Sequence, residues 1–361
     1  MLKPQCVSHP SGMRAKPCCT WLVGKTLELP EPKDSYIKKM RKLKIKQKEN
    51  QPMKKKYSYE EFKSVLSGII KQKFGNEINI EIHNVIKNNS LELEGMVLYG
   101  NKKKISPNFY LQVYYEEYLQ GTGIEDIAGL MYNKYIELKD MDYDSFDLDI
   151  EKCKDKIVCR LVSFQKNSQL LEEIPYIPFL DLAIIFYCLV IENGNGIGSV
   201  RITNPIMDEW GITTKMLYKT AIYNTEKIFP KVFCPLKIML KNMLENGEAV
   251  MSGMQDTVNK CILQEEDAPF ILTNERGING AAVILYPGCL KEIGEITGLD
   301  LYILPSSIHE LLVIPDDGQV YTHELKKMVH EVNESCVVEE EVLSDQIYHY
   351  STEKNIIEIC V

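Results

Sequence analysis

The sequence predicts an α+β fold, with mixed or antiparallel sheets and packed helices, arranged as two globular units after a disordered basic leader. A composition of 45% hydrophobic and 26% charged residues is ordinary for a chain with a packed core. The length of 361 residues exceeds one typical domain, which favours two units. Strand-like and helix-like segments alternate in the final third, where two strands also follow one another directly, and this pattern is typical of α+β proteins.

Residues 1–52 differ from the remainder in charge. They carry 12 Lys and Arg against 4 Asp and Glu, with several prolines and no sustained apolar period, which predicts a disordered leader. A helix signal follows Met53 at once, so we expect the native protein to begin there and the leader to be an upstream-start artefact. The alternative is an arm that binds nucleic acid or a membrane surface. The acidic remainder would repel a phosphate backbone and is a poor candidate for nucleic-acid binding.

The first globular unit is predicted over residues 53–139. Ser58 and Glu61 form a capping box before an apolar stripe of helical period, and Gly75 ends this helix. Apolar residues alternate at 78–82 and 91–93 around two asparagines, which predicts a β-hairpin. A further helix is expected to end near residue 137, and five aspartates in 140–149 indicate a linker.

The second globular unit is predicted over residues 150–361. Strands are expected at 157–164 and 182–191, and the latter turns through a glycine-rich hairpin into 200–203. Thr213 or Thr214 caps a helix that Pro230 stops. The elements expected in the final third are strand 270–273, turn 275–280, strand 282–286, helix 289–297, strands 300–304 and 310–314, and helix 322–333.

The cysteines indicate a reducing compartment. Eleven are scattered along the chain without a C-x-x-C pair, several inside apolar runs, which is typical of reduced thiols. No secretory signal is evident at the start. The only long apolar stretch, 174–191, contains Asp181 and two prolines, so we expect a buried element and no membrane span. The predicted location is the cytoplasm.

Several binding motifs are incomplete. Residues 24–26 supply only the G-K-T ending of a phosphate-binding loop, and the glycines at 194–198 are followed by a strand where a dinucleotide site needs a helix. Three His-Glu dipeptides do not complete H-E-x-x-H, because Val313, Lys327 and Glu334 occupy the fifth positions. We therefore predict no metal and no cofactor.

A cluster of polar residues between two predicted strands is harder to dismiss. Ser306, Ser307, His309 and Glu310 place two hydroxyls, an imidazole and a carboxylate within five positions. Ser307 as nucleophile and His309 as base would suit acyl transfer. A non-catalytic ligand or partner site could use the cluster together with Asn274, from the nearby turn. Alternatively, the serines bond turn amides and His309 sits satisfied in the sheet.

Two segments carry a family resemblance. Residues 273–282, T-N-E-R-G-I-N-G-A-A, and 298–310, G-L-D-L-Y-I-L-P-S-S-I-H-E, resemble a bacterial domain-of-unknown-function family, the one numbered 5688. Residues 105–111, 332–334 and 342–345 are similar to it too. The resemblance extends from about residue 54 to the C-terminus, which supports Met53 as the start. It implies no activity, substrate or cofactor, because the family is uncharacterised.

The leading functional hypothesis is a cytoplasmic interaction or regulatory protein without catalysis, since each metal, phosphate and nucleophile template fails. Its partner would be a protein or a small molecule. One alternative is a hydrolase-like enzyme that uses the cluster from Ser306 to Glu310. The other is nucleic-acid binding through residues 1–52.

Overall fold

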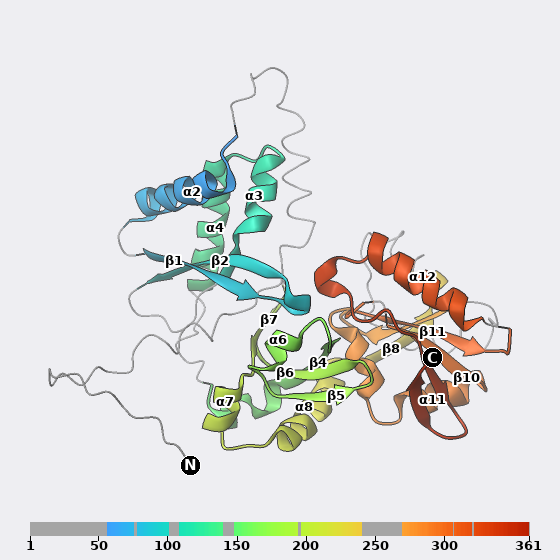
Figure 1. Cartoon of the computed structure of the whole chain (residues 1–361). Coiled ribbons are helices and arrows are strands. Elements are labelled where there is room, and N and C mark those ends of the chain that lie inside the picture. Colours follow the sequence, from blue (N-terminus) through green and yellow to red (C-terminus); the bar gives the residue numbers. More distant parts are fainter. Residues whose placement is uncertain are drawn as a thin grey trace, which may run out of the picture.

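Three antiparallel sheets and the helices packed on them make up the described part of the chain (Figure 1). The computed structural model describes residues 56–75, 78–100, 108–139, 148–193, 196–239, 269–305, 307–319 and 321–360. The predicted leader, 1–52, lies outside these ranges. The mixture of helices with antiparallel sheets confirms the predicted α+β class.

The first sheet belongs to the N-terminal part. The capping box predicted at Ser58 is present, with the Ser58 hydroxyl and the Glu61 carboxylate each accepting from the other's backbone N–H. The hairpin predicted after Gly75 is also present. A core of its own, centred on Phe62 and Met131, holds helices and sheet together. The elements are α2 (Tyr59–Phe74), β1 (Ile78–Ile86), η2 (Asn88–Ser90), β2 (Glu92–Gly100), β3 (Asn108–Tyr110), α3 (Leu111–Leu119) and α4 (Ile124–Lys139).

The second sheet is built around one long strand, β6, which has β4 on one edge and both β5 and β7 on the other. One face of this sheet packs on α7 and α8. The opposite face carries Val158, Ile185 and Tyr187. The elements are α5 (Ile150–Cys153), η3 (Lys154–Lys156), β4 (Ile157–Ser163), α6 (Ser168–Leu171), β5 (Tyr176–Phe179), β6 (Leu182–Asn193), β7 (Gly196–Arg201), α7 (Asn204–Glu209) and α8 (Thr214–Ile228).

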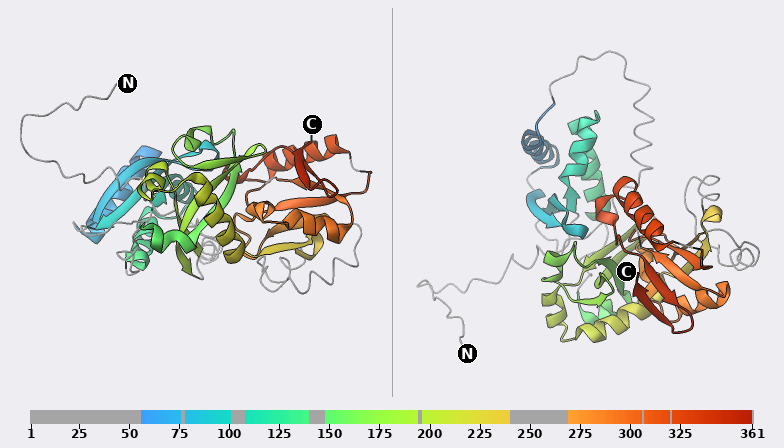
Figure 2. Two further views of the ribbon diagram at one scale, coloured as in Figure 1. Left: turned by 90° about the horizontal axis from the view of Figure 1, so that it is seen from below. Right: turned by 45° about the vertical axis from the view of Figure 1, so that its right-hand side comes forward.

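The third sheet has six strands in the order β13-β12-β10-β11-β9-β8. Helix α12 covers one face, while α11 and η5 lie on the other and share a core with the second sheet (Figure 2). The elements are β8 (Lys231–Pro235), β9 (Phe270–Asn274), η5 (Gly280–Leu285), α11 (Cys289–Thr297), β10 (Asp300–Leu304), β11 (Leu311–Asp316), α12 (Thr322–Ser335), η6 (Glu339–Glu341), β12 (Tyr348–Ser351) and β13 (Ile356–Ile359).

The strand predicted at 282–286 is wrong, because residues 282–285 lie in the 3-10 helix η5 and Tyr286 directly follows it. A short apolar run that is buried all round has no periodicity by which to tell a strand from a helix. Asn279, in the left-handed region at φ 51°, turns the chain into η5. Gly280 is then packed so closely that a Cβ there would collide with the Thr273 hydroxyl and the His309 carbonyl.

An amide pair joins the tip of the first hairpin to the rest of the molecule. The Asn89 N–H donates to Asn167 Oδ1 at 2.9 Å, and Asn167 Nδ2 donates to Asn89 Oδ1 at 3.0 Å. Asn89 Nδ2 also donates to the carbonyls of Glu339 and Val342, both at 2.7 Å. The hairpin tip is thus fixed to the turn after β4 and to η6. The predicted division into units 53–139 and 150–361 stays a prediction, since most of 140–149 lies outside the described ranges.

Among the described residues, no helix combines the length and the apolar character needed to cross a membrane. Within the same ranges, no group of three or more His, Cys, Asp or Glu side chains is placed to hold a metal ion.

Replacing Asn167 by alanine is expected to lower the free energy of unfolding by about 2 to 4 kcal/mol. The substitution removes the Asn167 groups that bond the buried N–H and Oδ1 of Asn89. Urea denaturation measures the loss. Asn204→Ala is the matched control, since the Asn204 side chain makes one exposed bond, to the Glu172 carbonyl, and the backbone bond of its N–H to Glu173 is kept in the variant. Equal losses in the two variants would contradict the assigned role of the amide pair.

Candidate functional site

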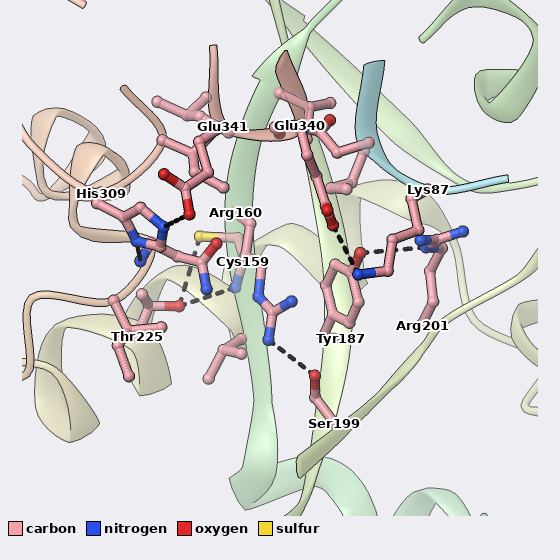
Figure 3. Close-up of a pocket in the computed structure, with 18 of the residues that line it drawn as sticks. Lys87, Cys159, Arg160, Tyr187, Ser199, Arg201, Thr225, His309, Glu340 and Glu341 are labelled. Carbon is pink, nitrogen blue, oxygen red and sulfur yellow. Dashed lines mark hydrogen bonds and ion pairs between the residues drawn. The ribbon is translucent and has the colours of Figure 1, made fainter. Parts of the chain in front are cut away.

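A cavity of about 460 Å³ lies where the tip of the first hairpin, the second sheet and the loops around the third sheet meet. Its floor is the face of the second sheet that carries Val158, Ile185 and Tyr187, and η2 and η6 border it from the first hairpin and from the segment after α12 (Figure 3). The turn 274–280 and the loop before β11 complete the wall. The amide pair of Asn89 and Asn167 sits beside this junction and holds the hairpin against the sheet.

Two arginines converge on one tyrosine at the cavity floor. Arg201 in β7 pairs directly with Tyr187 in β6, and its Nε donates to the Tyr187 hydroxyl at 3.1 Å. Val158 in β4 pairs with Tyr187 on the other edge, which puts Arg160, two residues further on, on the same face. The Arg160 guanidinium lies 3.8 Å from the Tyr187 ring centre and donates to the Ser199 hydroxyl at 2.7 Å. The strand register therefore gathers two guanidiniums around one ring.

A lysine reaches the cavity from the first hairpin. Lys87 directly follows β1, and its ammonium lies 2.9 Å from a Glu340 carboxylate oxygen in η6. It also lies 4.0 Å from the ring centre of Tyr110. The Lys87 side chain is only 10% exposed. This ion pair bridges the first hairpin and η6 at the cavity wall.

His309 forms part of the opposite wall, where the two segments that carry the family resemblance meet. Its Nδ1 accepts from the Asn279 N–H at 3.1 Å, and its Nε2 lies 3.3 Å from a Glu341 carboxylate oxygen. The Thr273 hydroxyl donates to the His309 carbonyl at 2.7 Å. Asn274 organises the turn, since its Oδ1 accepts from the Arg276 N–H and its Nδ2 donates to the Ile278 carbonyl.

The residues predicted for the site separate into three groups. Asn274 and His309 line the cavity. Ser307 is buried at 4% exposure outside the cavity lining, where its Oγ accepts from the His309 N–H at 3.0 Å. Glu310 also lies outside the lining. Burial raises the pKa of its carboxyl above the ordinary value, although His309 and a hydrogen bond from Ser307 act to lower it. Ser306 lies outside the described residues. The structure does not bring the Ser307 hydroxyl to the His309 imidazole.

Other reactive groups at the wall are buried and bonded. Thr225 Oγ1 accepts from the Cys159 N–H at 2.9 Å and donates to the Ala221 carbonyl at 2.6 Å. Burial raises the pKa of the Cys159 thiol to about 11, so the thiolate is scarce near neutral pH. This part of the wall offers packing and no activated nucleophile.

Sequence reasoning missed Lys87, Arg160, Tyr187, Ser199 and Arg201, because no local motif connects them. One signal was available. The chain has only five arginines, and the other basic residues are lysines; the arginines are Arg14, Arg41, Arg160, Arg201 and Arg276. Arginine inside a buried strand such as I-V-C-R-L-V-S is costly unless its charge is used or paired.

The model of a family of unknown function, DUF5688, matches residues 59–352. The chain belongs to this family. The match confirms the resemblance seen in the sequence and spans every element that borders the cavity, from β1 to η6. No curated protein and no solved structure matches the chain. The DUF5688 assignment thus brings no activity with it, and the function must be inferred from the cavity.

The contact between His309 and Glu341 should make stability depend on pH. Its hydrogen bond is the main cause that lowers the Glu341 pKa below the ordinary value. A carboxyl whose pKa is lowered by folding stabilises the protein above its unfolded pKa, and this contribution is lost as the pH falls through the folded value. Glu341→Gln is therefore expected to be destabilising near neutral pH, with a difference from wild type that shrinks on acidification.

Urea denaturation at several pH values between about 7 and about 3 measures this difference. The control is Glu339→Gln, because Glu339 is exposed in the same turn. A difference between wild type and Glu341→Gln that stays constant with pH would contradict the assignment.

Proposed function

We propose that this chain is a non-catalytic regulatory or interaction protein that binds a small anionic molecule in the cavity. The observation that carries the proposal is the convergence of Arg160 and Arg201 on Tyr187 at the cavity floor. Cavities of a few hundred Å³ with mainly apolar walls and a few placed polar groups are typical of small-molecule sites.

The distribution of charge supports an anionic ligand. The chain has a formal net charge of -9. Against this background, Lys87, Arg160 and Arg201 all line one cavity, together with the carboxylates of Glu340 and Glu341. Positive charge within low-dielectric walls attracts anions more strongly than the same charge spread over a surface. The cavity lining thus holds three cations and two carboxylates, a small positive excess on an acidic protein.

The bonding of the reactive groups supports binding without catalysis. A general base needs a ring nitrogen available to the substrate, whereas Nδ1 of His309 accepts a backbone N–H and Nε2 faces Glu341. A nucleophile needs an adjacent base, whereas the Thr225 hydroxyl is bonded to a backbone N–H and a carbonyl. These groups hold the wall in shape.

The cavity walls come from separate parts of the fold, and this arrangement supports a regulatory role. Lys87 comes from the first hairpin, Arg160 from the second sheet and His309 from the loop before β11 of the third sheet. A ligand that touches all three stabilises their packing, because any molecule that binds only the folded arrangement favours it. Ligand binding would then control how firmly the first hairpin is held, and with it a surface offered to a protein partner. We place this activity in a bacterial cytoplasm, which agrees with the buried cysteines that form no disulfide, among them Cys159, Cys188 and Cys234.

Small anions are expected to raise the melting temperature saturably, whereas neutral compounds of the same shape should not. Differential scanning fluorimetry of the full chain with matched phosphate, carboxylate and neutral compounds measures the shift. Arg160→Gln should reduce it, and Arg276→Gln should not, because Arg276 lies outside the cavity lining. A screen in which no anion raises the melting temperature would overturn the proposal.

The hydrolase alternative predicts a reactive Ser307. We expect no labelling of this residue by a fluorophosphonate probe, because its hydroxyl is buried and bonded to the His309 N–H. Mass spectrometry of the treated protein gives the answer, with Ser307→Ala as the control. Labelling that disappears in Ser307→Ala would favour the hydrolase instead.

A further inference from the structure

We propose that β1 is a dimerisation strand, which pairs antiparallel with β1 of a second copy of the chain and so joins the first sheets of the two protomers. This inference goes beyond the proposed function and needs no ligand in the cavity. It rests on the open outer edge of β1, on the contrast with the closed edge of β4, and on a residue pattern that is complementary to itself.

β1 is the outermost strand of the first sheet. It spans Ile78–Ile86, and among the described strands it pairs with β2 alone. The Lys87 N–H donates to the Leu91 carbonyl, so the odd-numbered residues of β1 direct their backbone groups toward β2. The even-numbered residues therefore direct their N–H and C=O groups outward. No other described segment bonds these outward groups.

The edge of β4, by contrast, is closed by side chains. The Cys159 N–H points away from β6 and donates to Thr225 Oγ1 at 2.9 Å. On the same edge, the Ile157 carbonyl accepts from Asn224 Nδ2 at 2.9 Å. Both partner side chains come from α8. The outward groups of β1 have no such partners among the described residues.

β1 also lacks the features that usually prevent an edge strand from pairing. Its nine residues, I-N-I-E-I-H-N-V-I, include no proline and no lysine, and its register with β2 is continuous from end to end. Glu81, Ile82 and Asn84 are exposed near its middle, Ile82 to 39%. An exposed isoleucine at the centre of an open edge loses contact with water when another strand pairs there. This edge is therefore suited to accept a further strand.

The residue pattern favours a second copy of β1 as the occupant. Antiparallel pairing about a two-fold axis at Ile82 is the register that matches all nine residues of one strand with all nine of the other. It places Ile82 opposite Ile82 of the partner subunit, where both residues have outward backbone groups to exchange hydrogen bonds. It also places Glu81 opposite His83 of the partner subunit, and the symmetry repeats this contact. A carboxylate beside an imidazole stabilises a cross-strand pair, whereas like charges oppose it.

Sedimentation velocity of the full chain tests the interface without any substitution. The sedimentation coefficient is expected to rise from that of a monomer to that of a dimer between about 1 µM and about 200 µM protein, because association follows mass action. Hydrogen exchange of peptides covering residues 78–86 should be slower at the high concentration, since the outward N–H groups become bonded. Circular dichroism checks that each variant below is folded.

Ile82→Lys should weaken the dimer at least about tenfold, because two ammonium groups then meet at the axis. Ile296→Lys is the matched control. Ile296 is an isoleucine of similar exposure, 42%, on α11, and its replacement should leave dimerisation as in wild type.

A charge exchange tests the register. His83→Glu places two carboxylates opposite each other at both ends of the axis, so the dimer should weaken at least about tenfold. Adding Glu81→Lys to this variant creates a Lys-Glu pair at each contact and should restore the dimer. Restoration by a second substitution cannot come from a loss of folding.

The outcomes decide separately on the strand and on its register. If Ile82→Lys and His83→Glu both dimerise like wild type, β1 is not the interface and the proposal is overturned. If His83→Glu weakens the dimer and the added Glu81→Lys does not restore it, the register about Ile82 is wrong. A chain that stays monomeric at every concentration overturns the proposal and leaves an extended segment of another protein as the occupant of this edge.

Discussion

The reciprocal amide pair of Asn89 and Asn167 is the interaction on which the candidate site depends. It ties the tip of the first hairpin to the turn after β4, and Asn89 also reaches the carbonyls of η6. Lys87 directly precedes this tip, so the same bonds bring an ammonium group to the cavity wall. The left-handed backbone of Asn89, at φ 59°, is what turns its N–H and side chain toward both partners. Asparagine tolerates this conformation better than most residues do.

Local sequence patterns predicted most of the regular elements, whereas features that depend on contacts between distant segments could not be predicted. The capping box at Ser58 marked the start of α2, and the asparagines between two alternating runs marked the hairpin. The run at 282–286 was misassigned because complete burial removes any periodicity. Strands β12 and β13 were not predicted, since each has only four residues and is defined by pairing with its neighbour.

The same distinction explains the site. Asn274 and His309 were found because they lie in compact polar segments of the sequence. Arg160 and Arg201 were missed because only the register of β6 with β4 and β7 brings them to one face. A catalytic pair of Ser307 and His309 was one of the alternatives that the sequence left open. In the folded chain, Ser307 instead accepts the N–H of His309, and the imidazole turns to Asn279 and Glu341.

The hydrogen bonds of Asn89 also have a consequence for the order of folding. Its bond to the Val342 carbonyl links residues 253 positions apart in the chain. Contacts between such distant segments form late, because the chain loses the entropy of a long loop before the contact repays it. Strand pairs such as β1 with β2 or β10 with β11 close much shorter loops and lose less entropy. The cavity is therefore expected to take shape after the local strand pairs, because its lining is complete only when the chain up to Glu341 has folded against the first hairpin.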